Sequence, residues 1–381
     1  MPKIPRKVKR RHAAFAVIIL AVISLSVIVA LYFNDMSRLS TGLVNRPALF
    51  KVAAAGDWGC GSDTDMTVTN IKAKDPRIIL ALGDFGYQEA EDFPGHKCLD
   101  GAAWASTMKP IKKNLLMVVG NHDLTEKKYP DLLNKYLEYF GRCTPLVGCL
   151  ESYYSFNLHR VHFLILNSEF GWRKGTPQYL FADNDLSKAS SDTNTDWIVV
   201  AYHSARYASI SAWLKLIFNT DLSNKYLKPY DDNNYDSLSK DFVNTYHPLF
   251  DKYGVDIVLQ GHVHNYQRTY PLNYVSPDKP PERTSTTKDV YFRPNGQIYL
   301  TVGTGGVELN PVEPEHNIWI SSLGHQSEPN DDYYIVKSDY SHYGFLEIQF
   351  SPYRKAVLGT FYGNDVLNKG SIVLDQFSII K

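Results

Sequence analysis

Five motifs share one pattern, in which an apolar run ends and a side chain able to bind a metal follows. They are GDWG at 56–59 after the run 50–55, GDFGY at 83–87 after 78–82, GNHD at 120–123 after 115–119, a histidine after 198–202, and GHVH at 261–264 after 255–260. The donors are Asp57, Asp84, Tyr87, Asn121, His203, His262 and His264. Oxygen and nitrogen donors without a thiolate suit iron, manganese or zinc. Seven donors are too many for one four-coordinate ion, so the sequence predicts two ions that share a carboxylate, as in two-metal hydrolytic sites.

The apolar runs read as strands that bring these motifs to one edge of a sheet. In an open α/β sheet, ligands bind beyond the carboxyl ends of the strands. A further apolar run lies at 161–166, and apolar residues have helical spacing at 129–140 and 238–253. Four more strands are predicted at 297–302, 344–350, 356–361 and 371–379, whereas the polar stretches 204–240 and 276–294 read as inserted loops. We expect one α/β domain with two sheets.

The N-terminal segment has a different character. Six basic residues precede an uncharged apolar run at 13–33, which has 21 residues and at about 1.5 Å per residue spans about 30 Å. We expect a basic cytoplasmic leader at 1–12, a transmembrane signal anchor at 13–33, a linker at 34–48 and an extracytoplasmic domain at 49–381. The alternative is a secreted protein with a cleaved signal peptide, although Ala30-Leu31-Tyr32 makes a poor small-x-small cleavage site.

The charge balance argues against one class of protein, the dedicated nucleic-acid binders. The chain has 40 basic and 40 acidic residues, so its formal charge is zero, and it lacks the basic excess of a dedicated nucleic-acid binder. The first 33 residues carry six of the basic residues and none of the acidic ones, which leaves a formal charge of −6 on the remainder. No nucleic-acid partner is expected.

An extracytoplasmic location lets the four cysteines pair. Cys60, Cys98, Cys143 and Cys149 are even in number and allow three connectivities. We favour Cys143–Cys149, which closes a short loop, together with Cys60–Cys98, which ties two loops near the motifs. No C-x-x-C spacing occurs, so structural zinc and thioredoxin-like chemistry are not expected.

As an ordered set, the five motifs resemble the calcineurin-like metallophosphoesterase superfamily. The tyrosine of GDFGY is similar to the signature of the purple acid phosphatases within it, and the continuation at 265–268 resembles the larger, plant-type members. Those members usually carry an additional N-terminal β-domain, where this chain has only its short linker. The resemblance implies a catalytic domain at 49–381 with two packed mixed β-sheets flanked by helices, a four-layer α/β/β/α sandwich.

The resemblance also implies a ligand set for two different ions. Iron(III) would be bound by Asp57, Tyr87 and His264, a divalent ion (Fe, Zn or Mn) by Asn121, His203 and His262, and Asp84 would bridge the two. A tyrosine, with an ordinary pKa near 10, becomes a phenolate ligand only beside a strongly Lewis-acidic ion, which agrees with a trivalent metal at Tyr87.

The activity that the resemblance implies is acid-phosphatase-type hydrolysis of phosphate monoesters. Metal-bound hydroxide would attack phosphorus, and His122, which follows the metal-binding Asn121, is the expected acid for the leaving group. The family often has a proline and two histidines after the motif at His203, but this chain does not, so Arg206 and Tyr207 are the remaining candidates for substrate binding. Two alternatives stay open: a Mn- or Zn-dependent phosphodiesterase or nucleotide hydrolase, and an inactive cell-surface binding protein. The oligomeric state is not predicted.

Overall fold

The computed structural model divides into two units, 1–49 and 50–381, and it describes a defined part of the chain. The described residues are 49–87, 102–123, 143–144, 148–149, 152–169, 171–205, 207–211, 232–276, 279, 281–309, 317–319, 334–351 and 355–381. The predicted leader, anchor and linker, the predicted helix 129–140, Cys98 and Arg206 lie outside them. None of the helices within the described ranges is both long and apolar enough to span a membrane.

The first sheet has seven strands in the order β14-β20-β19-β18-β1-β2-β3. Strands β1, β2 and β3 are parallel, β18 to β20 form an antiparallel meander beside β1, and β14 runs parallel to β20. The bounds are β1 Phe50–Ala55, β2 Ile78–Ala81, β3 Leu115–Met117, β14 Val290–Phe292, β18 Gly344–Ser351, β19 Ala356–Asp365 and β20 Gly370–Ile380. Every residue of β2 and β3 is buried, as expected of parallel strands covered on both faces.

The second sheet also has seven strands, in the order β17-β11-β15-β10-β8-β7-β6. Its four central strands, β7, β8, β10 and β15, are parallel, and antiparallel strands complete both edges. The bounds are β6 Tyr154–Leu158, β7 Val161–Ile165, β8 Trp197–Ser204, β10 Ile257–Gly261, β11 Tyr266–Thr269, β15 Ile298–Val302 and β17 Ile335–Asp339.

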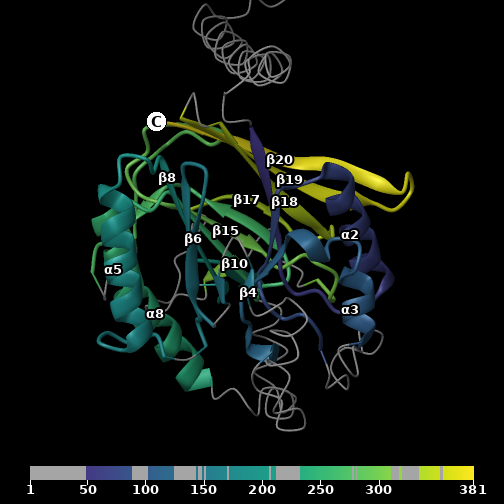
Figure 1. Ribbon diagram of the computed structural model, residues 1–381, viewed down its shortest axis with the longest axis horizontal. Helices are drawn as coiled ribbons and strands as arrows, with labels where there is room; N and C mark the ends of the chain where they lie inside the picture. Colours follow the sequence, from purple (N-terminus) through teal and green to yellow (C-terminus); the bar gives the residue numbers. More distant parts are fainter. Residues whose placement is uncertain are drawn as a thin grey trace, which may run out of the picture. The chain divides into compact units, whose positions relative to one another are not determined.

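The two sheets pack face to face, with helices outside them (Figure 1). Aromatic rings join the sheets in the core: Tyr266 of β11 stacks on Phe361 of β19 with ring centroids 4.0 Å apart. Figure 1 shows α5 (Pro177–Ser191) and α8 (Asp232–Tyr253) on one side, and α2 (Ser62–Lys74) and α3 (Ala102–Met108) on the other. A second apolar cluster fills the space between α5, α8 and the second sheet. The predicted two-sheet α/β architecture flanked by helices is therefore confirmed.

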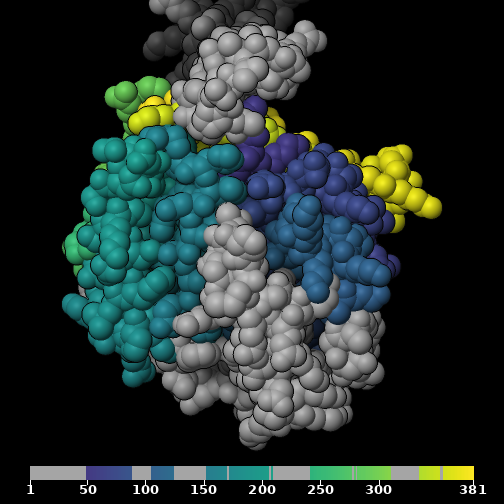
Figure 2. All heavy atoms as spheres, viewed as in Figure 1, coloured from purple at the N-terminus to yellow at the C-terminus, as the bar shows by residue number. Residues whose placement is uncertain are grey.

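Short elements complete the described chain. These are β4 Cys143–Thr144, β5 Gly148–Cys149, β9 Ser209–Ser211, β12 Leu272–Asn273, β13 Glu282–Arg283, β16 Asn317–Trp319, and the 3₁₀ helices η1 Lys112–Asn114 and η2 Asn121–Asp123. Cys60 is disulfide-bonded, and Cys143 lies directly opposite Cys149 in the β4–β5 pair, a register that suits the predicted Cys143–Cys149 bridge. The turn between β19 and β20 projects at the edge of the domain (Figure 2). Leu367 in this turn is 93% exposed, so an apolar side chain faces solvent there.

Part of the predicted secondary structure was wrong or incomplete. The stretch 276–294, predicted as a loop, contains β13 and β14, and β14 extends the first sheet. Helices α2 and α5 were not predicted. Helix α2 is largely polar, but it buries Val68 and Ile71 in the core. Hydrogen bonds add to this packing: Asn70 donates to Asn364 Oδ1 (2.8 Å), and Asn364 donates to Thr67 Oγ1 (2.8 Å).

Candidate metal centre

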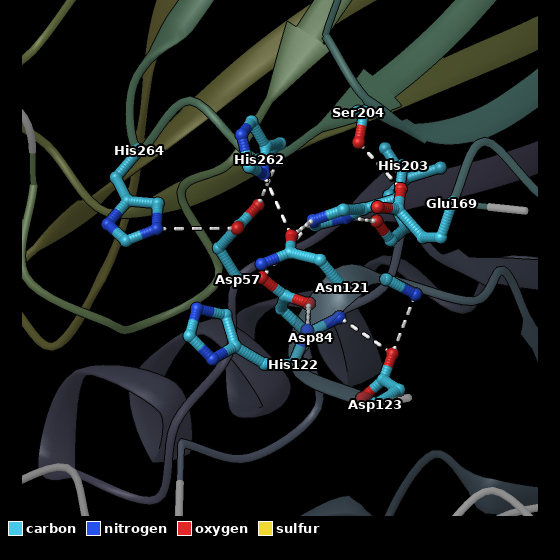
Figure 3. Close-up of polar contacts among 12 residues, drawn as sticks. Asp57, Asp84, Asn121, His122, Asp123, Glu169, His203, Ser204, His262 and His264 are labelled. Atoms are coloured by element: carbon cyan, nitrogen blue, oxygen red, sulfur yellow. Dashed lines mark hydrogen bonds and ion pairs between the residues drawn. The ribbon is translucent and has the colours of Figure 1, made fainter. Parts of the chain in front are cut away.

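The seven predicted donors converge at the carboxyl ends of strands from both sheets, β1, β2 and β3 in the first and β8 and β10 in the second. Figure 3 shows Asp57, Asp84, Asn121 and the three histidines of this set. The loop after β1 carries Asp57, the loop after β2 carries Asp84 and Tyr87, and η2 after β3 carries Asn121. His203 is the second-to-last residue of β8, and the loop after β10 carries His262 and His264. The sequence predicted that strand ends bring these side chains to one edge of a sheet, and the structure brings them together from strand ends of two sheets.

Asp57, Tyr87 and His264 form the first group of donors. The Tyr87 hydroxyl lies 3.2 Å from Asp57 Oδ1 and 3.1 Å from His264 Nε2. His264 Nε2 is 3.4 Å from the same carboxylate oxygen of Asp57. All three side chains are buried, so their donor atoms face one another with little access to solvent.

Asn121, His203 and His262 form the second group. The side-chain oxygen of Asn121 lies 3.0 Å from His203 Nε2 and 2.9 Å from His262 Nδ1. Asn121 and His203 are buried, whereas His262 is partly exposed at the edge of the group.

Asp84 lies between the two groups and contacts both. Its Oδ2 is 3.1 Å from His203 Nε2 in the second group and 3.4 Å from the Tyr87 hydroxyl in the first. Its Oδ1 accepts a hydrogen bond from the backbone N–H of His122 at 2.8 Å. The Asp84 carboxylate is thus held in contact with both groups of donors.

The donor spacing fits bound cations. Two donors about 2.1 Å from one ion and at right angles to each other are about 3.0 Å apart, and the contacts within each group are 2.9–3.4 Å. The Asp84, His203 and His262 donor atoms lie within 4.8 Å of one another. Two histidines are also oriented by their second ring nitrogen, as in metal sites: His203 Nδ1 bonds to Leu82 O (2.7 Å), and His264 Nδ1 to Glu308 O (2.8 Å).

Three of the donor residues have a backbone conformation that L-residues rarely adopt. The φ angles of Asp57, Asp84 and His262 are 61°, 54° and 69°, in the left-handed region that costs a non-glycine residue about 1 kcal/mol or more. Gly83 makes the close approach possible, because a Cβ there would lie 2.5 Å from His203 Nδ1. A Cβ on Gly120 would overlap Asp84 Oδ1. The loops therefore pack tightly to bring the donors together.

The electrostatics of the donor cluster favour a positive charge among the donors. Burial would raise the pKa of Asp84, but His203, His122 and His262 hold it far below its usual range. Burial would lower the pKa of His203, but Asp84 raises it well above its usual range. Burial and the negative charges of Asp57 and Asp84 raise the pKa of Tyr87 well above 10. A phenolate at Tyr87 therefore requires a cation beside it.

The structure places two further predicted site residues. His122 is partly exposed beside the donors, and its ring centroid lies 4.5 Å from that of Tyr87. Tyr207 is not brought to the cluster: it is buried, its hydroxyl bonds to His247 Nδ1 (2.7 Å), and its ring packs on Tyr299 at 4.7 Å. Its role is packing between the second sheet and α8, so the structure corrects the expectation of a substrate contact.

Asp123 was not predicted as a site residue, although it belongs to the GNHD motif. Its Oδ2 accepts the backbone N–H groups of Asp84 (3.0 Å) and Gly120 (2.8 Å), and its Oδ1 accepts that of Phe85 (3.0 Å). The side chain is 1% exposed. Asp123 therefore ties the loop that carries Asp84 to the loop that carries Asn121.

A group around Glu169 was also not predicted. Glu169 Oε1 accepts hydrogen bonds from the hydroxyls of Ser168 and Ser204, both at 2.6 Å. Ser204 directly follows His203, and Figure 3 shows Glu169 beside this histidine. The only signal in the sequence is the position of Glu169 after the apolar run 161–166, at the same sheet edge as the donors.

The fold and the site define a member of the calcineurin-like phosphoesterase family. The model of that family matches residues 50–266, more than half of the chain, so the chain belongs to it. Within the family, the chain is 25% identical over 278 residues to purple acid phosphatase 23 of Arabidopsis thaliana, with 67% of this chain and 52% of that protein covered. It is 26% identical over 267 residues to the probable inactive purple acid phosphatase 24 of the same plant, with 66% and 38% covered. The chain thus spans about half the length of the first of these relatives.

A solved structure shares the fold of this chain. The purple acid phosphatase PPD1 of yellow lupin (Lupinus luteus) has a similar fold, with a TM-score of 0.61 and 21% identity over 88% of this chain and 54% of that one. The resemblance to purple acid phosphatases that the GDFGY motif predicted is confirmed by these relatives.

Proposed function

We propose that the chain is a phosphate monoester hydrolase with a dinuclear metal site of the purple acid phosphatase type. One observation carries the proposal: the donors fall into two groups of three, and Asp84 contacts a member of each group. Membership of the calcineurin-like phosphoesterase family supports it. The relatives named as purple acid phosphatases support the choice of a phosphate ester as substrate.

The two groups differ in charge, which suits two different ions. Asp57 and Tyr87 offer a carboxylate and a phenol, and with His264 they would hold iron(III). Asn121, His203 and His262 are neutral donors when they bind a metal, and they would hold a divalent iron, zinc or manganese ion. When bound, the pair of ions supplies Lewis-acid stabilisation of phosphate charge and activation of water.

In the proposed reaction, His122 moves a proton. Its backbone is fixed by the hydrogen bond to Asp84 Oδ1 (2.8 Å), and its ring rests against Tyr87. The side chain is partly exposed, unlike most of the donors, so an ester bound at the donors can reach it. In this role His122 donates a proton to the departing alkoxide, which would otherwise leave as a poor, charged group.

We also propose that the domain is anchored outside the cytoplasm by the segment 13–33. The support comes from the sequence: the apolar run is long enough to span a bilayer, and the basic residues before it orient the N-terminus toward the cytoplasm. The disulfide at Cys60 suits an oxidising compartment. Protease accessibility of the domain on intact cells, with retention in the membrane fraction, tests both parts of this proposal.

Activity assays on a monoester and a diester, together with a visible absorption spectrum, test the proposed reaction. We expect monoester hydrolysis by a coloured protein, because phenolate at Tyr87 bound to iron(III) absorbs visible light. A colourless protein with manganese-dependent diesterase activity would support the rival phosphodiesterase instead. A folded protein without metal or activity would support an inactive binding protein, as the name of one relative suggests for that relative.

A further inference from the structure

The segment 303–308, with the sequence GTGGVE, lies outside the five motifs but next to the donors. It follows β15, which pairs in parallel with β10, so it leaves the second sheet at the same edge as His262 and His264. Residues 303–307 are buried, and Glu308 is exposed. The segment is therefore a further loop at the sheet edge that carries the metal donors.

Hydrogen bonds join this segment to the loop of Asp57. Gly305 N–H donates to Gly56 O at 2.8 Å. The N–H groups of Gly306 and Val307 both donate to Asp57 O at 3.1 Å. Asp57 has a φ angle of 61°, in the left-handed region that L-residues rarely adopt. Two hydrogen bonds to one carbonyl group thus hold the unusual backbone of this donor in place.

The same segment orients His264, a second donor of the first group. His264 Nδ1 bonds to Glu308 O at 2.8 Å, while Nε2 faces the Tyr87 hydroxyl (3.1 Å) and Asp57 Oδ1 (3.4 Å). A carbonyl acceptor keeps the proton on Nδ1, so Nε2 can offer its lone pair to a metal. The segment therefore contacts two of the three donors that would hold iron(III).

The segment also joins the two sheets. Thr304 Oγ1 donates to Gly344 O (3.0 Å), and Gly344 N–H donates to Thr304 O (2.8 Å), at the first residue of β18 in the first sheet. Gly56 N–H, after β1 of the first sheet, donates to Val302 O of β15 at 2.8 Å. Asp57 follows a strand of the first sheet and His264 a strand of the second, so these contacts fix the two donors relative to each other.

Gly303 allows the segment to approach the donors closely. A Cβ at this position would overlap the carbonyl oxygen of Val263, the residue between His262 and His264, and would lie 2.9 Å from Asp57 Oδ2. Atoms at that separation must shift. A side chain at 303 would therefore move Asp57, the loop of His264, or both.

We propose that the segment 303–308 positions Asp57 and His264 as a pair, so that both can bind one iron(III) ion. The inference rests on the proposed dinuclear site and adds a determinant of iron affinity outside the seven donors. Groups that orient metal ligands typically change metal affinity by about 10–100-fold. Loss of the positioning should therefore weaken iron binding by about that factor.

Gly303→Ala tests the inference, with Gly359→Ala as the matched control. Gly359 is a buried glycine of β19 in the middle of the first sheet, where an added Cβ would overlap the ring of Phe377. Both variants therefore bring a methyl group into a crowded place, but only one of these places borders the donors. Competition with a chelator gives the dissociation constants of iron(III) and zinc for each folded full-length protein.

We expect the iron dissociation constant to rise by about 10–100-fold in Gly303→Ala, with a smaller change for zinc. In Gly359→Ala it should stay at the wild-type value. An unchanged constant in Gly303→Ala, an equal rise in Gly359→Ala, or equal rises for iron and zinc would overturn the positioning role alone. A wild-type protein that binds no iron would instead overturn the proposed iron site, and the positioning role with it.

A pair of variants at Thr304 decides the matter if Gly303→Ala does not fold. Thr304→Val removes the hydroxyl that bonds to Gly344 O but keeps the shape of the side chain. It should raise the iron dissociation constant by about two- to ten-fold, because one buried hydrogen bond of the segment is lost. Thr304→Ser keeps the hydroxyl and should bind iron as the wild type does. Equal iron affinity in the two variants would overturn the inference.

Discussion

Replacing Asp123 by asparagine should loosen the junction between the loops of Asp84 and Asn121. The two carboxylate oxygens accept three buried backbone N–H groups. An asparagine can keep its oxygen toward the N–H groups of Asp84 and Gly120, but its NH₂ then faces the N–H of Phe85. One buried donor loses its acceptor, which costs about 1–3 kcal/mol of the free energy of unfolding.

Denaturant unfolding of the wild-type protein, Asp123→Asn and Asp241→Asn measures this cost. Asp241 is exposed on α8, so its substitution should change the free energy of unfolding by less than about 0.5 kcal/mol. Metal content provides a second readout, because Asp123 accepts the backbone N–H of Asp84, the proposed bridging ligand. Unfolding of Asp123→Asn at the same denaturant concentration as the wild type, with equal retention of metal, would refute this reasoning.

The same residue predicts a pH dependence. Burial and the charge of Asp84 raise the pKa of Asp123, while hydrogen bonds from Gly120 and Phe85 oppose the rise. A raised pKa in the folded state means that the unfolded chain loses this proton first as pH increases above about 4. The stability that the wild type has over Asp123→Asn should therefore shrink as pH rises, up to the folded pKa. Bound metal offsets the charge of Asp84, so this slope should be smaller in the metal-loaded protein.

Three further predictions concern other parts of the molecule. His122→Ala should slow hydrolysis of alkyl phosphates by about 10²–10⁴-fold, and that of an activated aryl phosphate much less; equal losses on both esters would exclude a role as acid. Arg268→Leu should lower the free energy of unfolding by about 3–5 kcal/mol, because Arg268 Nε pairs with the buried Asp375 at 2.7 Å. A loss below about 1 kcal/mol in denaturant unfolding would contradict this. Burial would raise the pKa of Asp196, but Arg160 lowers it. Arg160→Ala should therefore destabilise the folded protein at pH 7, and this effect should disappear as pH falls below about 4. A difference in thermal unfolding that persists near pH 2 would argue against the pair.

The sequence predicted the parts of the fold that depend on apolar patterning. Strands such as β2 and β8 are continuous runs in which every residue is buried, and metal donors lie at or just after their carboxyl ends. Helix α2 was not predicted in this way, because its buried face mixes the apolar Val68 and Ile71 with Thr67 and Asn70, which contact Asn364. Its partner Asn364 is distant in the sequence, and no local pattern shows such a contact.

The candidate site likewise contains residues that the sequence predicted and residues that it did not. The donors could be predicted because metal binding restricts the residue type and glycines mark the tight turns. Tyr207 was wrongly expected to contact substrate, since its buried partners Tyr299 and His247 come from other elements. Asp123 and Glu169 were missed because they bind backbone N–H groups and hydroxyls, which many residue types could do.

The central claim is that seven side chains hold two metal ions. Elemental analysis of the purified full-length protein, and of Asp84→Asn, tests it most directly. We predict two ions per wild-type chain, at least one of them iron, and fewer than two in the variant, because Asp84 contacts both groups of donors. A folded wild-type protein with one ion or none, or a variant that retains both ions with unchanged affinity, would contradict the claim.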